Sequence, residues 1–133
     1  MIIRGEEARK LLAELGMLDD TKPNKYRNKK IIIDGIKFDS EKEANRYAQL
    51  RILLRAGEIS ELELQKNFVL IPTQRGADGK VIERAVKYIA DFYYRDNRRN
   101  RYVVEDTKGV RTDDYVIKRK LMLYIHKLKI KEI

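Results

Sequence analysis

The sequence predicts an α/β domain in which a mixed sheet is flanked by helices. Two segments with helical periodicity, 40–57 and 112–125, alternate with β-rich runs along the chain. The last residues, 127–133, return to a period of two, which is typical of a strand. Because strands and helices are interleaved along the chain, we expect a mixed sheet covered by helices.

A helix and a basic segment are expected to precede the domain. Residues 4–16 carry apolar side chains at helical spacing and end on a glycine. Residues 17–30 are polar and basic and are interrupted by Pro23, which is typical of a linker or an arm. We therefore expect residues 1–29 to form a helix with a basic arm, and residues 30–133 to form the domain.

The domain is expected to begin with a hairpin and its clearest helix. An Asp-Gly pair separates two β-rich runs over 30–38, as a tight primed turn requires. Ser40 followed by Glu43 fits a capping box, and a glycine ends the helix 40–57.

Further strands and a second helix are expected to follow. The expected elements are 61–71 as one or two strands, strands 83–94 and 101–108, helix 112–125 and strand 127–133. Either Thr112 or Asp113 can cap the second helix. The apolar face of this helix is expected to contain Ile117, Leu121, Tyr124 and Leu128.

Composition narrows the classes of partner and cofactor. The 133 residues are enough for one modest core, and 30 Lys and Arg against 21 Asp and Glu give a formal charge of +9. This excess favours a polyanionic partner, with nucleic acid first, although a merely soluble basic protein has the same charge. The chain has no cysteine and one histidine, which excludes disulfides, Cys-containing zinc sites and multi-histidine metal sites.

The sequence gives no sign of membrane insertion or export. No apolar run approaches the roughly 20 residues of a membrane span. The first residues lack the apolar core of a signal peptide, so we expect a cytoplasmic protein.

Acidic residues at the ends of two neighbouring strands form the candidate site. Residues two apart share a face of a strand, so Asp106 and Lys108 are expected on one face and Glu105 on the other. Asp91 lies in the preceding strand, and a hairpin would bring it close to Asp106. Two adjacent carboxylates repel unless a cation bridges them, and hard oxygen ligands suit Mg²⁺ or Mn²⁺.

A third acid is expected from the first long helix. Glu43 shares a narrow stripe with Tyr47 and Leu50, so it is expected to point toward the sheet. Gln65, in the strand that follows, faces the same way as two nearby glutamates and is expected to line the site.

Each of these residues also has an ordinary structural alternative. Glu43 can be only the second half of a capping box with Ser40. Asp91 can pair with a nearby arginine, and Asp106 with Lys108 can form a weak surface ion pair. Because all of them fall around one strand pair and one helix, we favour a shared site.

The segments IAD at 89–91 and DTK at 106–108, with Glu43 on the preceding helix, resemble the motif of the PD-(D/E)xK nuclease superfamily. The superfamily core, α-β-β-β-α-β, matches the order of elements expected over 40–133. The chain is also similar to small phage-encoded proteins with FDSxxEAxRY, ADF and VEDxKG segments, and to Holliday-junction resolvases and transposon-end nucleases that share this core.

Two positions depart from the superfamily pattern. Ala90 stands where the superfamily often has proline. Glu105 precedes Asp106, so either residue could be the second acid of the motif. Strand alternation favours Asp106 because it shares a face with Lys108.

The resemblance implies a restriction-endonuclease-like fold and Mg²⁺-dependent hydrolysis of phosphodiesters. By this resemblance Asp91, Asp106 and the Thr107 carbonyl hold a metal ion, and Glu43 ligates that ion through water or binds a second one. Lys108 then orients the attacking water or stabilises the transition state.

Clusters of basic residues are expected to bind the DNA backbone. They are Arg95, Arg98, Arg99 and Arg101 at a hairpin tip, and Lys118, Arg119 and Lys120 on the second helix. Taken singly, each fits a solvated surface equally well.

The expected function is a phage or prophage endonuclease that cuts branched DNA, such as a recombination junction, as a homodimer. The alternatives are a non-catalytic DNA-binding module on the same fold and an RNA-processing nuclease.

Overall fold

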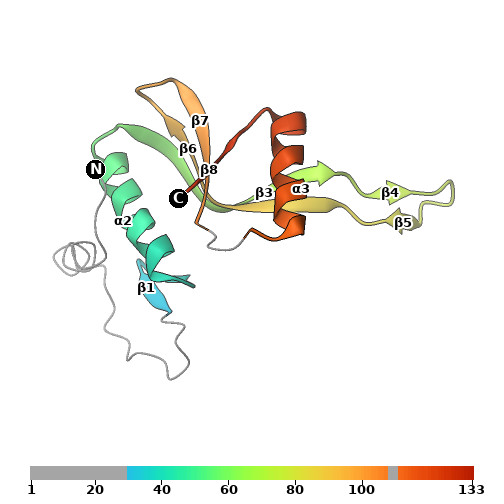
Figure 1. The fold of residues 1–133 in the computed structure, drawn as a ribbon, viewed down its shortest axis with the longest axis horizontal. Helices are drawn as coiled ribbons and strands as arrows, with labels where there is room; N and C mark the ends of the chain where they lie inside the picture. Colours follow the sequence, from blue (N-terminus) through green and yellow to red (C-terminus); the bar gives the residue numbers. More distant parts are fainter. Residues whose placement is uncertain (1–29, 108–110) are drawn as a thin grey trace. The chain divides into compact units, whose positions relative to one another are not determined.

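The computed structural model describes residues 30–107 and 111–133, which form two compact units that divide between Glu58 and Ile59 (Figure 1). The first unit contains β1 (Ile31–Ile33), β2 (Ile36–Phe38) and α2 (Glu41–Arg55). The second contains β3 (Ile59–Ile71), β4 (Gln74–Arg75), β5 (Val81–Glu83), β6 (Val86–Asp96), β7 (Arg101–Asp106), α3 (Asp113–Leu121), the π-helix η1 (Met122–His126) and β8 (Ile130–Glu132). The expected N-terminal helix and arm, and Lys108, lie outside the described residues.

The first unit opens with the hairpin that the sequence predicts. β1 pairs antiparallel with β2, and Ile33 lies opposite Ile36. Asp34 and Gly35 between them have φ angles of 52° and 75°. Two successive left-handed residues make a primed turn, whose twist matches that of the paired strands.

Helix α2 has the caps that its sequence indicates. The Ser40 hydroxyl accepts a hydrogen bond from the Glu43 N–H at 3.1 Å. At the other end the Gly57 N–H donates to Leu54 and the Glu58 N–H to Leu53, at 3.1 and 3.0 Å. This pair of bonds is a Schellman motif, and it needs the left-handed φ of 74° at Gly57.

The second unit is built on a four-stranded mixed sheet in the order β3-β6-β7-β8. β6 pairs antiparallel with both β3 and β7, whereas β7 and β8 run parallel. A parallel neighbour needs a crossover connection, and α3 supplies it between β7 and β8. The order α2, β3, β6, β7, α3, β8 agrees with the predicted succession of elements.

The expected apolar face of helix α3 and the residues after it is confirmed in part, because Leu121 and Leu128 pack against the buried cluster of this sheet. Tyr115 and Met122 are buried in a cluster with Phe68, Leu70, Tyr88, Ala90, Val104 and Ile130. Ile117 and Tyr124 are instead 57 % and 76 % exposed, so that part of the prediction is wrong. Tyr115 and Met122 are seven residues apart in the sequence, and so are Ile117 and Tyr124. The second pair is shifted from the first by two residues, which turns it by about 200° around the helix axis. The pattern therefore allowed either face to be the buried one.

The small sheet of β4 and β5 is absent from the sequence prediction, which placed no strand between residues 71 and 83. These strands pair antiparallel and extend the ends of β3 and β6 (Figure 1). Their residues are exposed, so no hydrophobic alternation marked them. The α/β class and the mixed sheet are confirmed, and the finer restriction-endonuclease-like arrangement stays a prediction.

Candidate functional site

Asp91, near the middle of β6, gathers the polar contacts of the candidate site. Its Oδ2 accepts hydrogen bonds from the Thr107 N–H at 2.8 Å and from the Thr107 hydroxyl at 2.7 Å. Its Oδ1 accepts a longer bond from the Gln65 amide at 3.3 Å. β6, β3 and the residue after β7 thus converge on one carboxylate.

These contacts lie where β6 and β7 stop pairing. The pairing runs from Asp96 with Arg101 to Phe92 with Glu105. Asp91 is one residue beyond Phe92 and Thr107 is two residues beyond Glu105, and the Asp91 carboxylate accepts a hydrogen bond from the Thr107 N–H. A buried N–H needs an acceptor, and here a side chain supplies it in place of the neighbouring backbone. We call this end of the pairing, with Asp91, Asp106 and Thr107, the strand fork.

Gln65, on the other side of Asp91, has an unusual backbone. Its φ of 51° is in the left-handed region although it lies inside a strand and is not glycine. Such conformations cost of the order of 1–3 kcal/mol and cluster at functional sites. Gln65 was expected to line the site, and its amide does contact Asp91. The strained backbone gave no signal in the sequence.

The two acids at the end of β7 bind different tyrosines. Asp106 is 1 % exposed, and its Oδ2 accepts a hydrogen bond from the Tyr88 hydroxyl at 2.6 Å. Glu105 is fully buried and accepts a hydrogen bond from the Tyr94 hydroxyl. The alternative in which Asp106 belongs to a surface ion pair is therefore wrong, because this carboxylate is buried.

Tyr88 is held in its protonated, donating form. Burial raises the pKa of Tyr88 well above its usual value, and the hydrogen bond to Asp106 raises it further. The charge of Asp91 acts in the same direction, so both acids lie within electrostatic range of this phenol. Tyr88 therefore remains a hydrogen-bond donor to Asp106 throughout the ordinary pH range. Sequence reasoning missed this role, and the only signal was a hydroxyl-bearing aromatic residue on a buried strand beside the acids.

The donor chemistry at the strand fork fits Mg²⁺ or Mn²⁺ in part. Two carboxylates and a carbonyl are hard oxygen donors, and Mg²⁺ is commonly held by one or two carboxylates together with water and substrate phosphate. Oδ2 of Asp91 already accepts two hydrogen bonds, so Oδ1 has more capacity left. Within the two described ranges, however, no group of three or more acidic or histidine side chains is arranged to hold a metal ion.

Glu43 is buried on α2, as its place on the helix predicts. Its N–H donates to Ser40, so the cap reading is confirmed for that half of the box. Glu43 belongs to the unit that ends at Glu58, whereas Asp91 and Asp106 belong to the other unit. Its membership of the site stays a prediction.

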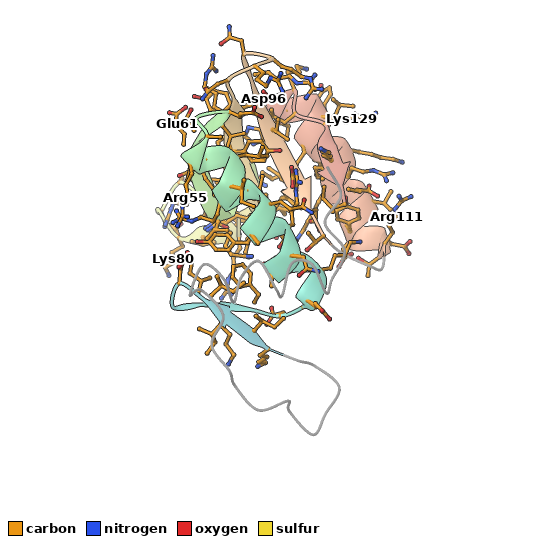
Figure 2. All side chains as sticks on the ribbon, turned by 90° about the vertical axis from the view of Figure 1, so that its left-hand side faces the viewer. Arg55, Glu61, Lys80, Asp96, Arg111 and Lys129 are labelled. Atoms are coloured by element: carbon orange, nitrogen blue, oxygen red, sulfur yellow. The ribbon has the colours of Figure 1, made fainter. Side chains whose placement is uncertain are left out.

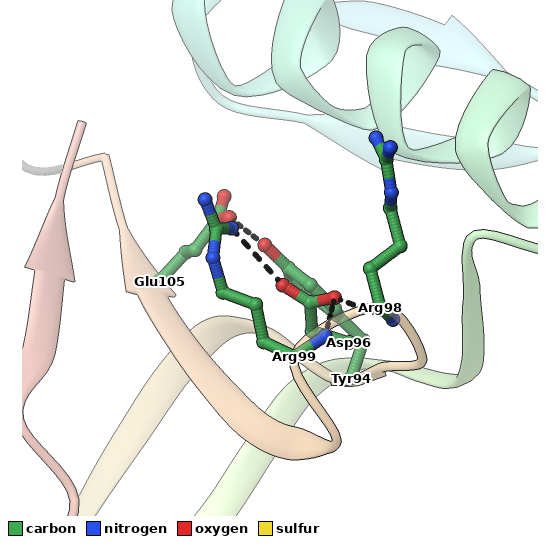
Figure 3. Close-up of polar contacts among 5 residues, drawn as sticks. All are labelled: Tyr94, Asp96, Arg98, Arg99 and Glu105. Carbon is green, nitrogen blue, oxygen red and sulfur yellow. Dashed lines mark hydrogen bonds and ion pairs between the residues drawn. The ribbon is translucent and has the colours of Figure 1, made fainter.

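The arginine-rich turn between β6 and β7 is organised by Asp96 (Figure 3). Its Oδ1 accepts the N–H groups of Arg98 and Arg99 at 3.0 and 3.1 Å, and its Oδ2 accepts from the Arg99 guanidinium at 3.2 Å. The Arg99 N–H is the main reason why the pKa of Asp96 is lowered. Figure 2 shows Asp96 and Glu61 at the same end of the sheet, in agreement with the pairing of Asp96 with Ile59. The acid fixes the turn and offsets part of its positive charge.

The remaining basic residues differ in their contacts. Arg95 donates to the Asn100 side chain and lies over the Tyr102 ring. Arg119 forms an ion pair with Glu132 at 3.2 Å, which lowers its availability to a phosphate. Arg101 and Lys120 are exposed. Lys118 is half-buried.

A family model described as "Protein of unknown function (DUF1064)" matches residues 23–132. The chain belongs to the DUF1064 family. The DUF1064 match contains the strand fork, α2 and almost all of the described residues, and it leaves out the whole of the expected N-terminal helix, residues 4–16. No curated protein and no solved structure matches the chain.

Proposed function

We propose that this DUF1064 protein is a divalent-metal-dependent endonuclease that hydrolyses phosphodiester bonds in DNA. The observation that supports it is the strand fork, where Thr107, the residue after Asp106, donates two hydrogen bonds to Asp91. An acid with a purely structural role would explain the hydrogen bond from the Thr107 N–H to Asp91, and would need no second carboxylate nearby. Two carboxylates at one strand ending, followed in sequence by Lys108, form a donor set suited to a metal ion and a phosphate.

The residues have separate roles in this proposal. Asp91, Asp106 and the Thr107 carbonyl would hold the ion. When bound, the ion lowers the pKa of a water molecule and neutralises charge on the phosphate. Tyr88 fixes the Asp106 carboxylate, and Thr107 fixes that of Asp91.

The substrate part of the proposal rests on the sequence resemblance and on charge. The formal charge of +9 favours a polyanion, and branched DNA in phage recombination or replication is the proposed substrate. Cutting both strands of a symmetric junction favours a two-fold homodimer. No helix in the described part of the chain is long and apolar enough to cross a membrane.

A DNA-binding module without catalysis is the second candidate. The nearly complete burial of Asp106 favours it. Both candidates predict binding to DNA, so only hydrolysis separates them.

The test is cleavage of plasmid, four-way junction and an RNA hairpin with Mg²⁺, Mn²⁺ or EDTA. We expect metal-dependent cutting of the junction, and a loss of roughly a hundred-fold or more in Asp91→Asn and Asp106→Asn, the scale for removing one group that stabilises transition-state charge. Asp39→Asn, at an exposed acid outside the site, is the matched control and should cut normally.

The other outcomes have defined meanings. Binding without cutting by the wild-type protein favours the module, and preferential cutting of the RNA hairpin favours an RNA-processing nuclease. Full activity in both Asp variants contradicts the site.

A further inference from the structure

Beside the strand fork, four side chains of the second unit form a continuous stack, which we call the tyrosine ladder. The Tyr93 and Tyr102 rings are 5.3 Å apart between centroids and inclined by only 10°. Lys66 Nζ lies 5.7 Å from the Tyr93 centroid, and Arg95 Cζ lies 5.1 Å from the Tyr102 centroid. The order along the ladder is cation, ring, ring, cation.

The ladder begins next to the candidate site. Tyr93 is two residues from Asp91 along β6, and Lys66 follows Gln65, whose amide contacts Asp91. A strand whose phosphate lies at Asp91 therefore has the ladder within reach of its neighbouring nucleotides.

The ladder is accessible at its Arg95 end. Tyr102 is 39 % exposed. In the two described ranges, no carboxylate forms an ion pair with Arg95, whose guanidinium contacts only the Asn100 side chain and the Tyr102 ring. A guanidinium plane accepts an aromatic ring on each side, so a base can extend the stack at Arg95.

We propose that the tyrosine ladder binds unpaired bases of a nucleic-acid strand. Parallel rings next to a cation are features by which proteins hold single strands, since every base has a π-face and every nucleotide a phosphate. Arg95 is the cation that faces the ligand in this proposal, because Lys66 is ion-paired with Glu63 at 3.3 Å. Bases inside a duplex stack on each other and do not offer these faces. The inference deepens the proposed function, on which its position beside Asp91 rests: the substrate strand would be unpaired next to the scissile phosphate.

Cross-strand packing is the ordinary explanation of such a stack. Aromatic pairs on neighbouring strands stabilise sheets without any ligand, and the Tyr102 hydroxyl also donates to Glu61 at 2.9 Å. Packing alone predicts that the rings affect stability and leave nucleic-acid binding unchanged.

The test measures fluorescence anisotropy of labelled oligothymidylate, oligouridylate and a DNA hairpin duplex with the full chain in EDTA. We expect Tyr102→Ala to weaken single-strand binding by about ten-fold, the size of one lost base–aromatic contact. Binding of the duplex should change much less. Oligouridylate distinguishes an RNA strand from a DNA strand as the preferred ligand, and either result is binding by the ladder.

Two further variants separate stacking from other effects. Tyr102→Phe keeps the ring and loses the bond to Glu61, so it should bind single strands nearly as the wild type does. Tyr124→Ala removes another exposed tyrosine, which carries Lys127 5.3 Å from its ring centroid but lies on η1, and should leave binding unchanged.

The proposal is overturned if Tyr102→Ala binds single strands normally, if it weakens single strands and duplex alike, or if Tyr124→Ala has the same effect. Because no metal is present, the result is independent of cleavage. Asp106→Asn should lose roughly a hundred-fold or more in cutting and still bind oligothymidylate, so failure of the nuclease proposal and failure of this one give different results.

Discussion

At the scale of single residues, the end of β7 carries two acids that are almost completely enclosed. Asp106 and Glu105 are adjacent, both are buried, and each accepts a bond from a tyrosine of β6. Strand alternation in the sequence favours Asp106 over Glu105 as the acid of the site. The two tyrosines offer a matched way to test this.

We expect Tyr88→Phe to reduce metal-dependent cleavage and Tyr94→Phe to leave it nearly unchanged. Each substitution removes one hydroxyl from a buried carboxylate, so each should lower the free energy of unfolding by roughly 1.5–3 kcal/mol. Only the first frees the acid that shares the strand fork with Asp91. Denaturant unfolding gives the stability, and junction cleavage at a temperature where both variants are folded gives the activity.

The opposite pattern, with cleavage lost only in Tyr94→Phe, would move the second acid from Asp106 to Glu105. Equal activity in both variants would show that neither phenol positions a catalytic carboxylate.

The residues of the site were partly accessible from the sequence. Strand alternation separated Asp106 from Glu105, and the hairpin between β6 and β7 brought Asp91 near them. The bonds from Thr107 to Asp91 depend on where the two strands separate, and the φ of Gln65 depends on the local course of β3. Neither is a property of residue type or spacing.

At the scale of elements, α2 shows how local chemistry sets the ends of a helix. Its final carbonyls are satisfied by the Schellman motif, which needs a left-handed residue at Gly57. A Cβ built at Gly57 meets nothing within 4 Å, so space does not limit the residue there. Only the backbone conformation does.

We expect Gly57→Ala to lower the free energy of unfolding by roughly 1–2 kcal/mol, the cost of placing a Cβ in the left-handed region. Gly57→Asn should cost less, because asparagine tolerates this conformation. Equilibrium denaturation measures both. Equal stability of the alanine variant and the wild type would contradict the conformational explanation.

The elements themselves were largely predictable, and their faces were not. The capping residues located α2, and the Asp-Gly turn located the first hairpin. The alternation of apolar and polar residues located the three long strands of the second unit. For α3 the sequence offered two apolar stripes, one through Tyr115 and one through Ile117. Packing against Tyr88 and Val104 decided between them, and this is information that only the folded sheet contains.

At the scale of the whole molecule, buried phenols couple the fold to alkaline pH. Burial, followed by a hydrogen bond to Asp34, raises the pKa of Tyr47 to about 12. Burial also raises the pKa values of Tyr88, Tyr93 and Tyr115. Each of these groups holds its proton more tightly in the folded chain than in the unfolded chain.

We expect stability to be unaffected by these groups below pH 10.0, the ordinary pKa of tyrosine, and to fall as the pH rises from there toward about 12. The sign follows from linkage, since the unfolded chain releases these protons first and is favoured by their loss. Ultraviolet titration of tyrosinate should show part of the eight tyrosines lagging behind the denatured protein. A titration that coincides with that of the denatured chain would contradict the burial of these phenols.

The strand fork also gives the protein an internal reporter of ligand arrival. The Thr107 amide proton is held by a carboxylate and not by a neighbouring strand, so its rate of isotope exchange depends on what else claims Asp91. A cation or phosphate that binds Asp91 should change the exchange rate of this one amide proton. The backbone amide protons that pair β6 with β7 should keep their exchange rates. Occupancy of the fork could then be followed by amide spectroscopy under conditions in which no bond is cut.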